Sequence, residues 1–218
     1  MKSLAIACAL AMGLSLPLTT LAQPAMPGMQ AAPQAAAAPA APKLHAALRG
    51  LWHGHLVATR DYATAVKAGN KAAEAKTADA VVANAKQISD AVAGFYGADA
   101  GKGLLTLLAG HWGGVKALTD ATHAGDKAAA DKAMQALATN AGEIAKFLHG
   151  ANPNHWPEAT VDGLLLQHAA DHQSLVGAIM AGDQATSAKD WTMMEEHMNT
   201  IADALSGGIA AQFPQKAQ

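Results

Sequence analysis

The chain has 218 residues, of which 51% are hydrophobic and only 4% aromatic, and its formal net charge is −2. A charge this close to neutral argues against nucleic acid or an anionic membrane as a partner. The only cysteine, Cys8, lies in a segment that we expect to be removed, so disulfides and thiolate metal ligands are excluded from the mature chain.

Residues 1–22 have the layout of a secretory signal peptide. A short basic start, Met1-Lys2, precedes an apolar run from Leu4 to Leu18, and small residues follow up to Ala22. The apolar run is shorter than the roughly 20 residues that a membrane-spanning helix needs. We therefore predict cleavage after Ala22, a periplasmic or secreted location, and no integral membrane segment in the mature form.

Residues 23–42 consist almost entirely of Ala, Pro, Gln, Met and Gly, and five of them are proline. This composition is typical of a disordered, flexible tether. Residues 43–214 differ, because their apolar positions recur with the period of a helix and no run of alternating β-branched residues interrupts them. They are long enough for one domain with its own core, and we predict that this domain is all-α.

Turn residues divide the domain into six helices, which we expect at 43–68, 71–96, 101–124, 127–150, 157–181 and 184–212. The sequence Ala68-Gly69-Asn70 recurs as Ala124-Gly125-Asp126 and as Ala181-Gly182-Asp183, at offsets of 56 and 57 residues. Glycine suits the left-handed end of a helix, and Asn or Asp caps the next one. The repeat therefore predicts three tandem helical hairpins that form one bundle.

The same offsets relate His55, His111 and His168. Each of these histidines continues the apolar stripe of its helix, which places it on the buried face. In the returning helices the offsets relate Asn84 and Asn140 to His197. At a rise of about 1.5 Å per residue, all six positions lie roughly 20 Å from the hairpin turns, so we expect one buried layer of His and Asn side chains.

Buried polar groups without partners cost roughly 1–3 kcal/mol each, so these side chains must bond to one another, to water or to a ligand. Neutral imidazoles suit Cu, Zn or Ni, and His172 lies one turn after His168 on the same face. The predicted metal ligands are His55, His111, His168, His172 and His197. The predicted supporting residues are Asn84, Asn140, Met194 and Tyr62, whose hydroxyl we expect to point toward the layer.

The sequence does not predict an enzyme. The inward faces carry no Glu-x-x-His element of the di-iron type, and the chain has no Gly-rich phosphate loop and no setting for a Ser or Cys nucleophile. Two facing helical histidines are, however, able to bind haem without a covalent attachment, and this alternative stays open.

Several elements resemble a family of small exported bacterial proteins that are all-helical and have no established activity. These elements are Leu51-Trp52-x-x-His55, Thr59-Arg60-x-Tyr62, Tyr96-Gly97, His111, Ala151-Asn152-Pro153 with Trp156-Pro157, and Ala202-Asp203-x-Leu205. The resemblance implies that His55, His111, His168 and His197 are features of that family. The chain departs from the family pattern at His155 and His172.

Two functional hypotheses follow from the sequence. The first is an exported protein that holds a transition metal in the histidine layer for storage, buffering or delivery. The second is a non-catalytic helical module that binds a protein partner or an apolar ligand, with a purely structural layer that fixes the register of the helices. The sequence identifies no particular protein partner.

Overall fold

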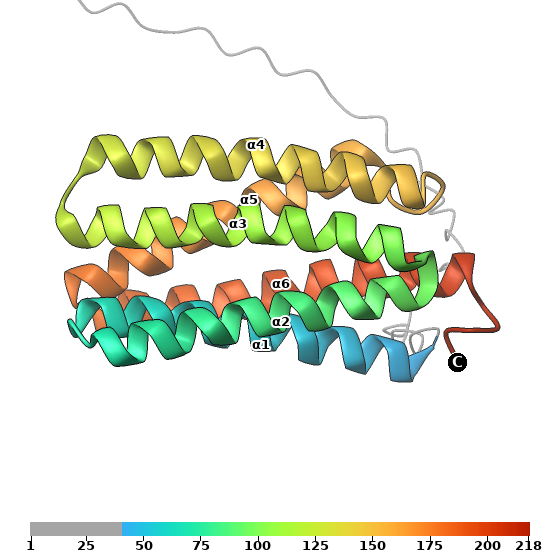
Figure 1. Ribbon diagram of the computed structural model, residues 1–218, viewed down its shortest axis with the longest axis horizontal. Helices are drawn as coiled ribbons and strands as arrows, with labels where there is room; N and C mark the ends of the chain where they lie inside the picture. Colours follow the sequence, from blue (N-terminus) through green and yellow to red (C-terminus); the bar gives the residue numbers. More distant parts are fainter. Residues whose placement is uncertain (1–40) are drawn as a thin grey trace, which may run out of the picture. The chain divides into compact units, whose positions relative to one another are not determined.

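The computed structural model describes residues 41–218. The helices in this range are α1 (Pro42–Lys67), α2 (Lys71–Tyr96), α3 (Ala98–Ala124), α4 (Lys127–Ala151), α5 (Glu158–Ala181) and α6 (Gln184–Gln212) (Figure 1). Residues 41–218 contain no strand, so the all-α prediction is confirmed. The predicted signal peptide and all but the last two residues of the predicted tether lie outside the described residues.

The six helices form a closed bundle. Each helix packs against the next one along the chain, and α6 packs against α1. In addition, α1, α3 and α5 contact one another, so these three helices line the centre and α2, α4 and α6 lie outside them. The α1–α2, α3–α4 and α5–α6 turns lie at the same end of the bundle, on the left in Figure 1.

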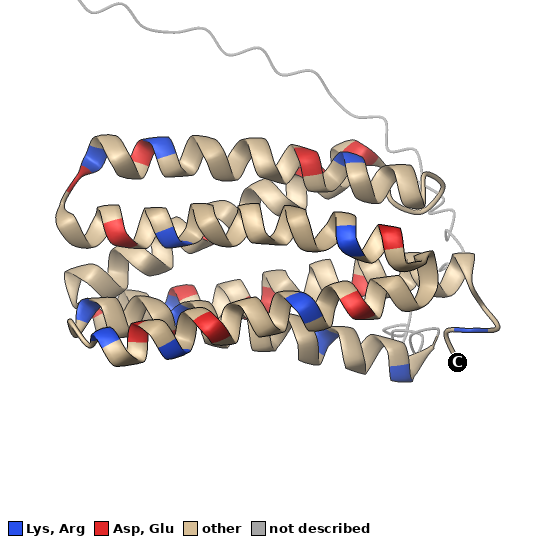
Figure 2. Cartoon of the chain, viewed as in Figure 1, with Lys and Arg blue, Asp and Glu red and all other residues tan. Residues whose placement is uncertain are grey.

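Two apolar clusters fill most of the core along the bundle. One lies toward the three glycine turns and includes Tyr62, Val115 and Leu137. The other lies toward the opposite end and includes Leu48 and Trp156. Lysines, arginines and acidic residues are mixed along the helices (Figure 2). None of the helices within residues 41–218 combines the length and the apolar character that crossing a membrane requires.

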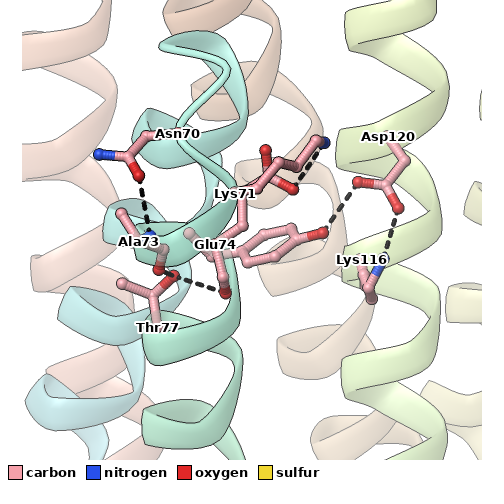
Figure 3. Close-up of polar contacts among 8 residues, drawn as sticks. Asn70, Lys71, Ala73, Glu74, Thr77, Lys116 and Asp120 are labelled. Atoms are coloured by element: carbon pink, nitrogen blue, oxygen red, sulfur yellow. Dashed lines mark hydrogen bonds and ion pairs between the residues drawn. The ribbon is translucent and has the colours of Figure 1, made fainter.

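The hairpin turns have the conformation that their sequences predict. Gly69, Gly125 and Gly182 have φ angles of 64°, 70° and 74°. The side chain of Asn70 accepts a hydrogen bond from the backbone N–H of Ala73 (Figure 3), and Asp126 and Asp183 cap α4 and α6 in the same way. These bonds satisfy N–H groups that a helix leaves free at its start.

Helix α3 begins three residues earlier than the predicted start at residue 101. Gly97 alone connects α2 to α3, because its φ of 94° lets the chain reverse in one residue. The two helices are then very close at Gly101, where a Cβ atom would lie 2.6 Å from Cβ of Ala93 and 3.0 Å from the carbonyl oxygen of Ser89. Glycine at 101 thus permits close helix packing rather than starting the helix.

Trp156, in the turn before α5, attaches that turn to α6. Its indole N–H donates to the carbonyl oxygen of Ala204 at 3.2 Å, while Nδ2 of Asn152 donates to the carbonyl oxygen of Gly208 at 2.9 Å. A Cβ atom at Gly208 would overlap the indole of Trp156, whereas a Cβ atom at the neighbouring Gly207 would contact nothing within 4 Å.

We expect opposite effects when these two neighbouring glycines are replaced by alanine. Gly208→Ala should lower the free energy of unfolding by about 1–3 kcal/mol, because the indole must move out of a packed site. Gly207→Ala should raise it by up to about 1 kcal/mol, because alanine favours the helix. Urea unfolding followed by circular dichroism measures both values, and equal stability of the two variants would contradict the packing of Trp156 on Gly208.

Candidate metal centre

Four buried histidines meet at the centre of the bundle. His55 comes from α1, His111 from α3, and His168 and His172 from α5, so all four are on the central helices. Their exposed fractions are 5%, 5%, 3% and 2%, respectively. One ring nitrogen of each lies within 4.8 Å of the corresponding nitrogen of every other ring, which is the range from which one ion is able to gather four ligands.

The four rings are arranged approximately as a tetrahedron. The centroids of His55, His111 and His168 form a triangle with sides of 6.0, 5.9 and 5.5 Å. The centroid of His172 lies 5.9, 5.8 and 4.5 Å from these three centroids, in the same order. Nε2 of His168 and Nε2 of His172 are 3.1 Å apart, close to the roughly 3.3 Å that separates two nitrogens bound to one tetrahedral zinc ion.

Half of the eight imidazole nitrogens at the centre have no hydrogen-bond partner within residues 41–218. Nε2 of His55, both ring nitrogens of His111 and Nδ1 of His168 are buried and unpartnered. Inside the group, one hydrogen bond forms, between Nε2 of His168 and Nε2 of His172. Each unpartnered nitrogen costs about 1–3 kcal/mol, so the packing of the surrounding helices must offset several such penalties.

Burial keeps all four rings uncharged near neutral pH. Burial and, to a smaller extent, the neighbouring His111 together lower the pKa of His55 to about 3. Burial lowers the pKa of His111 to about 4, against a smaller opposite effect of Asn140. The pKa values of His168 and His172 are also well below the ordinary value, first because of burial and then because of the neighbouring imidazoles. A neutral imidazole keeps one free lone pair, which is the form that binds a metal.

Asn84, Asn140 and His197 have the same role in the three hairpins. Nδ2 of Asn84 donates to the carbonyl oxygen of Leu51, and Nδ2 of Asn140 donates to that of Leu107. Nε2 of His197 lies 2.9 Å from the carbonyl oxygen of Leu164 and therefore acts as the donor. The accepting residue in each hairpin stands four positions before the repeated histidine.

His197 is therefore a predicted ligand that the structure does not bring into the four-histidine group. Its Nε2 is engaged with a backbone carbonyl, and its Nδ1 lies 3.9 Å from the carboxylate of Asp171. The two asparagines do fit a supporting role, because their side-chain oxygens are buried and unpartnered once Nδ2 has bonded to the backbone. The carboxamide of Asn140 also acts on the pKa of His111.

A neighbouring repeat position explains why the third hairpin has His197 where the other two have asparagine. A Cβ atom at Gly54 would lie 3.0 Å from Nδ2 of Asn84, and one at Gly110 would lie 3.1 Å from Nδ2 of Asn140. The third hairpin has Gln167 at the glycine position and His197 at the asparagine position. The sequence alone related His197 to Asn84 and Asn140, but the accompanying change from glycine to Gln167, which signals a different hydrogen-bond role for His197, was missed.

Tyr62 and Met194 are buried but lie in other surroundings. The hydroxyl of Tyr62 donates to Asp120 at 2.9 Å rather than to a histidine, and Lys116 donates to the same carboxylate (Figure 3). The hydroxyl therefore points toward Asp120 and not, as the sequence analysis predicted, toward the layer of His and Asn side chains. Met194 is fully buried in an apolar cluster with Leu56 and Leu175.

Comparisons with protein-family models, with curated proteins and with solved structures found no match to this chain. The family resemblance noted in the sequence stays a prediction, and the functional argument rests on the geometry of the four histidines.

The depressed pKa values predict that the metal-free protein loses stability in mild acid. An unfolded histidine takes up a proton near pH 6.5, whereas folded His55 and His111 stay neutral until about pH 3 and pH 4. Stability is therefore complete above pH 6.5 and falls as the pH drops, by about 2 kcal/mol per ring at pH 5. Urea unfolding between pH 8 and pH 5, with a chelator present, measures this loss.

A matched pair of variants assigns this pH dependence to the buried rings. His55→Leu should reduce the slope of stability against pH, because one neutral buried ring is gone. His155→Ala, at an exposed turn position, should leave the slope unchanged. If His55→Leu retains the slope of the unmodified protein, the protonation argument is wrong.

Proposed function

We propose that this protein binds one transition-metal ion through the imidazoles of His55, His111, His168 and His172. The observation that carries the proposal is their convergence: four buried, neutral rings from three helices lie within ligand distance of one another. A single ion would take up one lone pair from each ring, which relieves nitrogens that otherwise have no partner in the described chain.

The donor set favours particular metals. Four nitrogen ligands without a carboxylate or a thiolate suit Cu, Zn or Ni and are unsuited to Ca²⁺ or Mg²⁺, which require oxygen ligands. The nearly tetrahedral arrangement of the ring centroids favours Zn(II) or Cu(I) over the square-planar preference of Cu(II) or Ni(II).

The proposed role is to hold, buffer or deliver the ion rather than to catalyse a reaction. Zinc sites with four protein ligands are generally structural, whereas catalytic zinc sites keep one position for water. The proposed place of action is the periplasm or the extracellular space, and this part rests on the signal-peptide pattern of residues 1–22.

The two alternative functions gain less support. The cavity beside the histidines has a volume of about 60 Å³, far below the roughly 300 Å³ of the smallest typical cofactor pockets, so there is no room for haem. A purely structural layer would be expected to satisfy its own hydrogen bonds, as buried polar groups generally do, yet four ring nitrogens are left without a partner within residues 41–218.

The metal content of the protein tests the proposal directly. The full-length chain is expressed without an affinity tag, purified from the periplasm without a chelator, and analysed by elemental mass spectrometry. We expect close to one Zn or Cu per chain. His55→Leu and His172→Leu should each weaken the measured affinity for the metal by at least about 100-fold, because each variant removes one of the four nitrogens that would hold the ion.

His197→Asn is the matched control for these ligand variants. It is made together with Gln167→Gly, which gives the asparagine the glycine neighbour that it has in the other two hairpins, so it should keep the metal stoichiometry of the unmodified protein. A metal-free protein that takes up neither Zn nor Cu at micromolar concentration would contradict the proposal. Equal loss of metal in His197→Asn and His172→Leu would contradict the assigned set of four ligands.

A further inference from the structure

An apolar cavity lies directly against the four-histidine group. Its volume is about 60 Å³, and His55, His111 and His168 form part of its wall. The rest of the wall consists of aliphatic side chains, one alanine and the indoles of Trp52 and Trp156, and it includes no Asp, Glu, Lys or Arg. A cavity of this size exceeds the roughly 10–15 Å³ that one water needs, but its apolar wall offers water few hydrogen bonds.

The three central helices line the cavity with the same repeat positions. Two turns before each repeated histidine stand Leu48, Leu104 and Val161, and the positions one turn before are occupied by Trp52, Leu108 and Leu165. The cavity therefore extends over about 10 Å along the bundle, from the histidines toward the end that carries Trp156.

The fourth histidine lies on the other side of the group. His172 does not line the cavity, and it follows His168 by one turn, whereas the lining residues of α5 precede His168. A metal ion held by the four rings would therefore present to the cavity the triangular face between His55, His111 and His168. A ligand that enters through that face would take the place of His172 as the fourth ligand, because four nitrogens already complete the coordination of a tetrahedral ion.

We infer that this cavity is a binding site for a small, uncharged, apolar molecule of diatomic size, of the class that includes dioxygen and carbon monoxide. Contact between the bound molecule and a metal ion rests on the proposed function, whereas binding of the molecule in the cavity does not. A charged ligand would lose its hydration without a counter-charge in the wall. A cavity of roughly 150 Å³ holds benzene, so one of about 60 Å³ excludes rings of that size.

Xenon is the probe for the cavity itself, because apolar protein cavities bind it without any specific contact. Crystals of the metal-free protein, pressurised with xenon, should show one xenon atom between Leu108 and Leu165, and the xenon NMR shift should report the same binding in solution. Leu165→Phe should abolish binding by filling the cavity. Leu166→Phe, at the neighbouring position with a 40% exposed side chain, adds the same atoms outside and should leave binding intact.

Circular dichroism of both variants checks that they fold. The unmodified protein alone already tests the inference. If no xenon atom binds in the cavity, the inference is wrong, whatever metal the protein binds. Loss of binding in Leu166→Phe as well as in Leu165→Phe would equally overturn the assigned position.

Carbon monoxide tests the contact between the cavity and the metal. Loaded with Cu(I) under anaerobic conditions and exposed to carbon monoxide, the protein should show a C–O stretching band in the infrared, because carbon monoxide replaces the imidazole of His172 on the copper. Leu165→Phe should lose the band while retaining its copper. Absence of the band in a copper-loaded protein that binds xenon would overturn the metal contact. Failure to take up copper or zinc, with xenon still bound, would overturn the proposed function and leave the cavity site standing.

Discussion

The removal of four imidazoles from water is the physical constraint on which the centre of this protein depends. Desolvation makes the charged form of each ring unfavourable, so all four stay neutral, and each neutral ring carries one N–H donor and one lone pair. Within the group, one hydrogen bond joins Nε2 of His168 to Nε2 of His172. The remaining donors and lone pairs need other partners, and an ion at the centre together with the side-chain oxygens of Asn84 and Asn140 would supply them.

The internal repeat explains both the symmetry of the site and its completion. Closure of the bundle brings α1, α3 and α5 together, so one histidine repeated in each hairpin becomes a triangle of rings. Three nitrogens alone leave a tetrahedral site incomplete. His172 would complete such a site from a position where the other hairpins have Thr59 and Val115. One residue that departs from the repeat thus converts a threefold arrangement into four imidazoles around one point.

Helical periodicity and capping residues were enough to predict the all-α class and five of the six helix starts to within one residue, because both are local. Periodicity also placed His55, His111 and His168 on buried faces. It does not specify what a buried side chain meets across the bundle. The bond of Tyr62 to Asp120, the bond of His197 to a backbone carbonyl and the cavity beside the rings all depend on how distant helices pack. The early start of α3 was missed because the reversal at Gly97 requires only one residue.

The depth of the site bears on which metal-handling role suits the protein. None of the four histidines is more than 5% exposed, and they belong to three different helices, so an ion would reach or leave them only when the bundle opens locally. Mild acid would not release it readily, since burial has already lowered the pKa values of His55 and His111 to about 3 and 4 and protons compete poorly for these nitrogens. Because binding favours the folded bundle, the ion itself would oppose the opening that releases it. Slow exchange of this kind suits long-term retention of the metal better than rapid delivery.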